Sequence, residues 1–148
     1  MIAWLLQGSV RIFLYFIGKP RDEHANAMAE EYVKRASRYS RMEMREIQPA
    51  RFDPWEKHPS GTKILLDPGG KSMDSARFAQ LVSSAEREGR DLVFLIGGAS
   101  GFPETWADRP GMRLSLSGFI LPHEVARLLI AEQIYRALAT LRGHPYPK

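Results

Sequence analysis

Residues 92–101 read Leu-Val-Phe-Leu-Ile-Gly-Gly-Ala-Ser-Gly, five apolar residues that stop at a glycine-rich turn. A short unbroken apolar run of this kind is typical of a strand buried on both faces of a parallel sheet. Glycine has no Cβ, so the backbone of such a turn can approach a ligand closely. The sequence therefore predicts a central strand over 92–96. On spacing alone, the turn after it is either a ligand contact or a tight structural turn.

Outward from this stretch, strands alternate with helices. Strands are predicted at 11–17, 42–47, 63–66 and 113–116. Apolar residues at helical spacing predict helices at 23–36, 72–88 and 122–141, with Asp22 and Ser72 as N-caps and Gly89 just past the second helix. Residues 48–62 are predicted as a loop and 102–108 as a short helix. This order predicts one domain over 1–148, with 1–10 as an extension: an α/β fold with helices on a mostly parallel sheet.

The composition excludes several classes of protein. The 148 residues include no cysteine, so the chain has neither disulfides nor thiolate metal sites. The four histidines lack metal-ligand spacing, and no metal is expected. Polar residues interrupt the apolar start at 1–17, which is unlike a signal peptide or a membrane span. We expect a cytoplasmic protein. Attachment to a membrane through 1–17 is the weaker alternative, which fractionation would test.

Two further bends follow apolar segments. Asp67-Pro68-Gly69-Gly70 ends the strand at 63–66, and residues 116–121 are broken by Gly118 and halted by Pro122. Loops at the carboxyl ends of parallel strands meet at one edge of the sheet. With the turn at 97–101 they could enclose a ligand the size of adenosine. No dinucleotide fingerprint or phosphate-binding P-loop accompanies these bends.

Two features suggest partners, each with a simpler reading. The helix at 122–141 is apolar on more than one face, which indicates either a subunit interface or the central helix of a single core. If the first helix continued far enough, Lys34, Arg38, Arg41 and Arg45 would form a basic stripe for phosphates. The alternative is a solvated face. The net charge of +4 is compatible with a phosphate-rich partner and does not establish one.

The segment at 143–148, Gly-His-Pro-Tyr-Pro-Lys, is stiffened by two prolines. Tyr146 can stack on a nucleobase, and His144 and Lys148 can meet phosphate or a developing charge. The simpler reading is a frayed terminus.

Taken together, these segments resemble one family, the small bacterial methyltransferases that modify N3 of a pseudouridine in 23S ribosomal RNA. They belong to the SPOUT, or α/β-knot, class. The resemblance runs from about Arg11 to Lys148. Its strongest stretches are Leu66-Asp67, Gly70-Lys71, Gly97-Gly98 with Gly101, Leu116–His123, Ala131–Arg136 and His144-Pro145-Tyr146.

The resemblance implies a deep trefoil knot in the carboxyl-terminal half and S-adenosylmethionine as the methyl donor. It implies a homodimer that acts on 23S rRNA in the assembled ribosome, with the tail of one subunit completing the pocket of the other. No metal and no membrane are implied. The residues that should bind the cofactor are Leu66, Gly97, Leu116, Ser117, Gly118, Phe119, Ile120 and Leu121.

The tail departs from the family pattern at one position. Many relatives end His-Pro-Tyr-His before a basic residue, and here Pro147 replaces the second histidine. Tyr146, His144 and Arg136 are therefore the predicted catalytic residues. Arg136 or His144 would stabilise the imide anion that forms when N3 loses its proton, while Tyr146 packs on the base. His123 is expected to fix the loop beside the cofactor.

Two rival functions remain open on the sequence. One is a non-catalytic module that binds RNA or the ribosome on the same fold. The other is a different nucleotide-binding α/β enzyme, in which 97–101 cradles phosphate. Calorimetry separates them, because the first would not bind S-adenosylmethionine and the second would prefer a phosphorylated nucleotide.

Overall fold

The computed structural model describes residues 10–144 and 146. Its five strands form one sheet in the order β2-β1-β4-β3-β5, and every neighbouring pair is parallel. The strands are β1 (Arg11–Ile17), β2 (Arg41–Ile47), β3 (Thr62–Ser72), β4 (Leu92–Ile96) and β5 (Met112–Ser115). The helices are α2 (Glu23–Ala36), α3 (Pro54–Lys57), α4 (Ser75–Glu88) and α5 (His123–Leu141), with a 3₁₀ turn η1 (Glu104–Trp106). The predicted α/β fold with a parallel sheet is confirmed.

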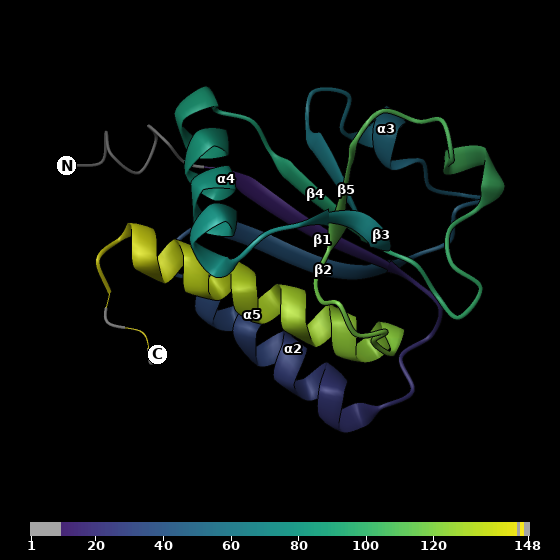
Figure 1. Cartoon of the computed structure of the whole chain (residues 1–148), viewed down its shortest axis with the longest axis horizontal. Helices are drawn as coiled ribbons and strands as arrows, with labels where there is room; N and C mark the ends of the chain where they lie inside the picture. The colour runs from purple at the N-terminus through teal and green to yellow at the C-terminus, as the bar shows by residue number, and fades with distance from the viewer. Residues whose placement is uncertain (1–9, 145, 147–148) are drawn as a thin grey trace.

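The two faces of the sheet are covered unequally (Figure 1). The long helices α2, α4 and α5 pack on one face and bury the larger core, which includes Ile12, Leu14 and Phe94. The short α3, η1 and loops cover the other face, where Trp55 and Trp106 meet edge to face, with ring centroids 5.2 Å apart. The central strand β4 is buried along its whole length, as its unbroken apolar run predicts.

Helix α5 occupies the middle of the three-helix layer, in contact with both α2 and α4. Its side chains at Ile130, Ala131, Ile134 and Leu138 are fully buried. Packing against two helices and the sheet thus accounts for most of the width of its apolar surface. The knot that the family resemblance implies stays a prediction.

The third strand is longer than predicted. Leu66 and Lys71 both align with Leu114 of β5, so residues 67–70 form a bulge within β3 instead of ending it. Ser72 is still paired with β5, and the prediction that it caps the next helix is wrong. The cap is Asp74, whose carboxylate accepts from the backbone N–H of Arg77 at 2.8 Å.

The basic stripe across Lys34, Arg38, Arg41 and Arg45 does not form. Helix α2 ends at Ala36, and the Ser37 hydroxyl donates to the carbonyl of Val33 at 2.8 Å. Arg41 and Arg45 lie on β2 instead.

Several local predictions are confirmed, and one loop holds more structure than expected. Asp22 caps α2, with its side chain accepting from the N–H groups of His24 and Ala25. Gly89 ends α4 in the left-handed conformation at φ 67°. The predicted loop at 48–62 contains the single turn α3, capped by Asp53.

Two further expectations concern metal sites and membrane-spanning segments. Within residues 10–144 and 146, no three His, Asp or Glu side chains gather as a metal site would require. In the same part of the chain, no helix has the length and apolar character needed to cross a bilayer. The extension at 1–9, together with Pro147 and Lys148 of the tail, lies outside the described residues.

Candidate active site

A cavity of about 310 Å³ lies at the carboxyl ends of β3, β4 and β5. All three predicted bends contribute to it, although they are far apart in the sequence. Its walls are mostly apolar, with hydroxyls, a carboxylate and an imidazole among them. The lining residues are Leu66, Asp67, Pro68, Ile96, Gly97, Gly98, Gly101, Phe102, Leu114, Ser115, Leu116, Ser117, Phe119, Leu121, His123 and Ala126.

The convergence predicted for the three bends is confirmed, and six of the eight predicted cofactor residues line the cavity. Gly118 and Ile120 are the two that do not. The Ile120 side chain is 89% exposed and points away from the core. The neighbouring Phe119 lines the cavity although it is 83% exposed, so it stands at the mouth.

The segment after β5 is shaped by its own serines. The Ser115 hydroxyl donates to the Ser117 carbonyl at 3.0 Å, and the Ser117 hydroxyl accepts from the N–H of Phe119 at 2.9 Å. These bonds fold 115–119 into a compact turn, and Leu116 packs against the larger core. The turn is therefore positioned to present backbone groups to a ligand.

On the opposite wall, close backbone contacts hold the bulge of β3 and the turn after β4. A Cβ on Gly70 would lie 2.6 Å from the backbone of Arg113, so only glycine fits there. A Cβ on Gly98 would lie 2.9 Å from the Ile17 carbonyl oxygen. The turn after β4 is thus packed directly against the end of β1.

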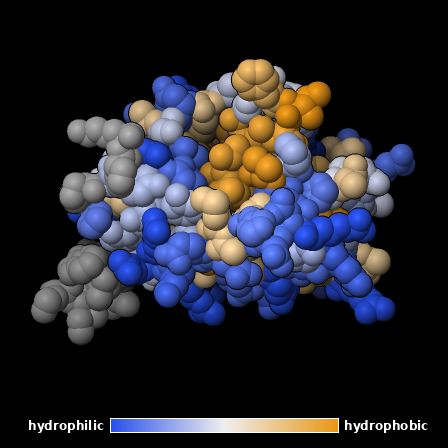
Figure 2. Space-filling model, turned by 90° about the horizontal axis from the view of Figure 1, so that it is seen from below, coloured by the Kyte–Doolittle hydropathy of each residue, from blue (hydrophilic) through white to orange (hydrophobic). Residues whose placement is uncertain are grey.

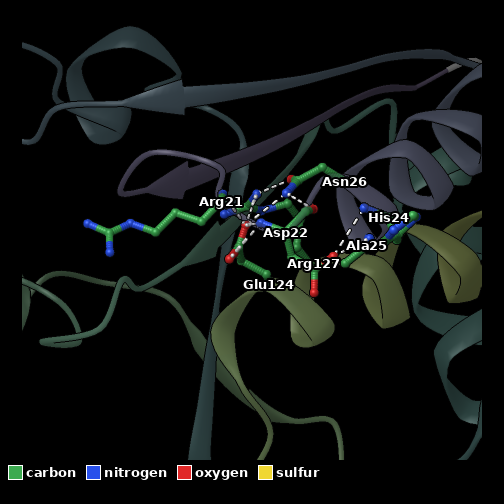
Figure 3. A network of polar contacts seen from close by, with 7 residues as sticks. All are labelled: Arg21, Asp22, His24, Ala25, Asn26, Glu124 and Arg127. Atoms are coloured by element: carbon green, nitrogen blue, oxygen red, sulfur yellow. Dashed lines mark hydrogen bonds and ion pairs between the residues drawn. The ribbon is translucent and has the colours of Figure 1, made fainter.

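The first turn of α5 forms a third wall, through His123 and Ala126. Glu124 in that turn accepts through Oε1 from the N–H of Arg21 at 2.7 Å and of Asp22 at 3.1 Å (Figure 3). The same oxygen accepts from Nδ2 of Asn26 at 2.8 Å. The wall of the cavity is therefore tied to the loop between β1 and α2.

These bonds lower the pKa of Glu124 to about 2, the backbone donor at Arg21 being the largest cause. Arg127 stands three residues after Glu124 in α5 and is fully buried. Its guanidinium carbon lies 3.5 Å from the centre of the Phe16 ring. Arg127 also donates to Oδ1 of Asn26. Burial lowers the pKa of Arg127, and Glu124, with Oε1 3.8 Å from Nη1, opposes that shift. These contacts join the start of α5 to the loop before α2, to α2 through Asn26 and to β1 through Phe16.

Two of the three predicted catalytic residues, Arg136 and Tyr146, assemble elsewhere, around Glu132. Its Oε2 accepts from Nη2 of Arg136 at 2.7 Å and from the Tyr146 hydroxyl at 2.9 Å. The guanidinium also lies 4.7 Å from the centre of the Tyr146 ring. Burial and the bonds to Tyr32 and Glu132 raise the pKa of the Tyr146 phenol, so it stays protonated at neutral pH. The carboxylate of Glu132 raises the pKa of Arg136, which stays charged.

His144 is exposed and meets the ring of Tyr39 edge to face, with centroids 6.1 Å apart. Thirteen residues of helix separate His123 at the cavity from Arg136, a rise of about 20 Å. A single copy of the chain therefore brings Arg136 and Tyr146 together and keeps both away from the cavity.

The sequence analysis assigned no role to three carboxylates of these groups. Asp67 lines the cavity and accepts from the N–H of Gly69 at 2.9 Å, and its place beside Leu66 was the available signal. Glu132 stood inside the stretch that carries the resemblance. Glu124 had no signal, because its partners lie about a hundred residues away in the chain.

Residues 10–147 match the family model described as "Predicted SPOUT methyltransferase". The chain belongs to the SPOUT methyltransferase family. Its curated relatives include a "Ribosomal RNA large subunit methyltransferase H" from Solibacter usitatus, 60% identical over 137 residues, which cover 93% of this chain and 99% of the relative. A protein of the same name from Gemmatimonas aurantiaca is 35% identical over 154 residues, covering 94% and 100%.

Solved structures agree on the architecture of this SPOUT methyltransferase. A probable methyltransferase from Bordetella pertussis Tohama I superposes with a TM-score of 0.59 at 13% identity, covering 93% of this chain and 99% of that one. An AdoMet-bound rRNA methyltransferase from Sinorhizobium meliloti gives 0.52 at 12% identity, covering 88% and 57%. At such low identity these likenesses establish the fold alone.

Proposed function

We propose that the protein transfers a methyl group from S-adenosylmethionine to large-subunit ribosomal RNA, at N3 of a pseudouridine in 23S rRNA. The observation that carries the proposal is the convergence of three strand-end bends on one cavity, in a chain that belongs to a methyltransferase family. The 60% identity to a ribosomal RNA large subunit methyltransferase supports the choice of substrate. The target is the assembled ribosome, and the place of action is the cytoplasm.

The cavity suits S-adenosylmethionine in size and chemistry. Its volume of about 310 Å³ lies at the lower end of the range for small-molecule sites. Apolar side chains such as Leu66, Ile96 and Leu116 supply walls for an adenine ring, and the turns offer backbone groups for its polar edge. Asp67 also lines the cavity, and its negative charge suits a cationic ligand. When bound, S-adenosylmethionine supplies an electrophilic methyl group on a sulfonium.

Arg136 of α5 and the tail residues His144 and Tyr146 have the properties needed to bind and activate the substrate base. N3 of pseudouridine must lose a proton before or during attack, and a fixed cation favours the resulting imide anion. Arg136 is such a cation, held in place by Glu132. Tyr146 offers an aromatic face beside it. His144 is exposed and lies near enough in the chain to reach the same base.

We further propose that the protein works as a homodimer, because one copy separates the cavity from these residues. Three of its large exposed apolar side chains, Phe119, Ile120 and Leu129, belong to α5 or to the segment leading into it. Figure 2 shows hydrophobic surface gathered into one patch on a face of the molecule. Burying this surface against a second copy would remove a solubility liability and bring a partner's tail toward the cavity.

A mixing experiment tests the shared site. Leu121→Trp would fill the cavity of one subunit, and Tyr146→Ala would remove the aromatic ring from the tail of the other. Each variant alone should be inactive. Co-refolded in equal amounts, they should regain about a quarter of the wild-type rate, since half of the dimers are mixed and each mixed dimer has one intact site. No recovery in a mixture shown to be dimeric would contradict the shared site.

The main experiment is mass mapping of large-subunit RNA from a strain that lacks the gene, with and without this protein restored. A methyl group that returns to a pseudouridine only with the protein supports the proposal. Calorimetry with S-adenosylmethionine should give binding that Tyr146→Ala leaves intact while methylation stops. A chain that binds ribosomes and not S-adenosylmethionine would instead be a non-catalytic module.

A further inference from the structure

The loop between β1 and α2, Gly18-Lys19-Pro20-Arg21, borders the cavity without lining it. We call these four residues the rim loop. At one end, the Ile17 carbonyl is the atom that a Cβ on Gly98 of the cavity wall would strike. At the other end, the Arg21 N–H donates to Glu124, in the same turn of α5 as His123 of the opposite wall. The rim loop therefore runs along the outside of the cavity from one wall to another.

The backbone of the rim loop is held in a defined shape. Gly18 turns the chain at φ 98°, in the left-handed region that favours glycine. Pro20 fixes its own φ angle. Beyond it, the N–H groups of Arg21 and Asp22 both end on the Glu124 carboxylate. Such a loop loses little conformational entropy when a partner binds it.

The two cations of the rim loop are exposed, and three carboxylates, Asp22, Glu23 and Glu124, belong to the same part of the fold. Neither Lys19 nor Arg21 takes part in any ion pair found among residues 10–144 and 146. The carboxylates of Asp22 and Glu124 keep their charge but accept from N–H groups of the backbone and of Asn26. Figure 3 shows the Arg21 side chain extending away from this network.

We propose that Lys19 and Arg21 bind backbone phosphates of the RNA that flank the target nucleotide. A nucleotide presented to the cavity brings its neighbouring phosphates to the cavity rim, where the rim loop presents two exposed cations that make no ion pair among the described residues. Backbone contacts of this kind position the substrate without reading its sequence. The inference rests on the proposed function, because it takes RNA as the substrate.

The test compares two double variants that remove the same charge. Lys19→Ala with Arg21→Ala clears the rim loop. Lys34→Ala with Arg38→Ala clears two exposed cations from the far end of α2 and the segment after it, about 20 Å away. Binding of each protein to purified ribosomes is measured by co-sedimentation over a range of salt concentrations. Methylation of the same ribosomes is measured in parallel, and urea unfolding verifies that both variants are folded.

The rim variant should bind ribosomes roughly 10-fold more weakly near 0.15 M salt, and the slope of log K against log salt should fall by about 1.5. The control variant should stay close to wild type. Equal binding by the rim variant and wild type, or an equal loss in the control, would overturn the inference. Ribosomes bound by wild type but left unmethylated would refute the proposed function instead, while the binding comparison still decides the role of the rim loop.

Discussion

The first turn and the middle of α5 are each organised by a glutamate, and the two carboxylates bind different groups. Glu124 in the first turn holds backbone, the N–H groups of Arg21 and Asp22. Glu132 near the middle holds side chains, the guanidinium of Arg136 and the hydroxyl of Tyr146. The first arrangement fixes the shape of a cavity wall. The second fixes the groups proposed to meet the substrate base.

The difference suggests how one helix serves two halves of a reaction. A cofactor pocket needs walls that do not move, and backbone bonds from another element supply that rigidity. Groups that act on a substrate need a set direction and charge, and an acceptor shared by a cation and a phenol supplies both. The two glutamates lie eight residues, or about 12 Å, apart on a single rigid element. The distance between the two sites is therefore set by the core that holds α5.

Ile134→Ala tests that dependence on the core and should have the largest effect. Ile134 is fully buried in the layer between α5 and the sheet. Removing three carbons leaves a cavity, so the free energy of unfolding should fall by about 2–5 kcal/mol, measured by urea denaturation. Met28→Ala on α2, at a side chain that is 51% exposed and outside the proposed subunit interface, should cost less than about 1 kcal/mol. Equal losses would mean that α5 is not anchored by its inner face.

Glu132→Ala should lower kcat/KM for ribosome methylation by roughly 100-fold, because Arg136 and Tyr146 lose the acceptor that orients them. The affinity for S-adenosylmethionine, measured by calorimetry, should not change. Glu132→Gln keeps an acceptor for the Tyr146 hydroxyl and removes the charge, so its loss should be smaller. Wild-type turnover in Glu132→Ala would show that this group takes no part in the reaction.

Glu124→Ala changes the first turn of α5 and should weaken the binding of S-adenosylmethionine. It strands the N–H groups of Arg21 and Asp22 and loosens the cavity wall, so S-adenosylmethionine should bind roughly tenfold more weakly. In Glu124→Gln a carbonyl oxygen can replace Oε1, which makes all the shortest contacts, and affinity should stay within about threefold of wild type. A glutamine variant as weak as the alanine variant would show that the charge matters more than the acceptor.

The smallest effect expected is the acid dependence of the Glu124 link. Its pKa of about 2 in the folded protein lies below the ordinary value of 4.5 for a glutamate. The stabilisation is therefore complete above about pH 4.5 and is lost as pH falls through about 2. Urea midpoints measured between pH 2 and 6 should differ between wild type and Glu124→Gln at the upper end and converge at the lower. A difference that persists unchanged at pH 2 would rule out this carboxylate as its source.

The sequence predicted the elements whose signals are local. The apolar run at 92–96, the cap at Asp22 and the glycine at 89 each act through immediate neighbours, and each is confirmed. Predictions failed where tertiary pairing overrode a local signal. Ser72 is a good cap residue, but its backbone pairs with Ser115 and holds it in the strand, so Asp74 takes the role.

Some features of the candidate site could likewise be predicted from the sequence, and others could not. The three bends could be predicted to meet, because parallel strands end at one edge of the sheet. The separation between the cavity and the tail residues could not, since it depends on the length and direction of α5 within the core. The partnership of Glu124 with the rim loop was equally out of reach, because nothing in either segment indicates the other.

Helix α5 follows all five strands in the chain, yet it covers the centre of their main face. Translation therefore delivers a complete sheet before the element that shields it. Until α5 docks, the apolar surface around Phe94 and Leu14 has no cover at its middle, and exposed apolar surface of this kind favours aggregation. A protein proposed to modify ribosomes would then be most vulnerable to aggregation at the moment it leaves one.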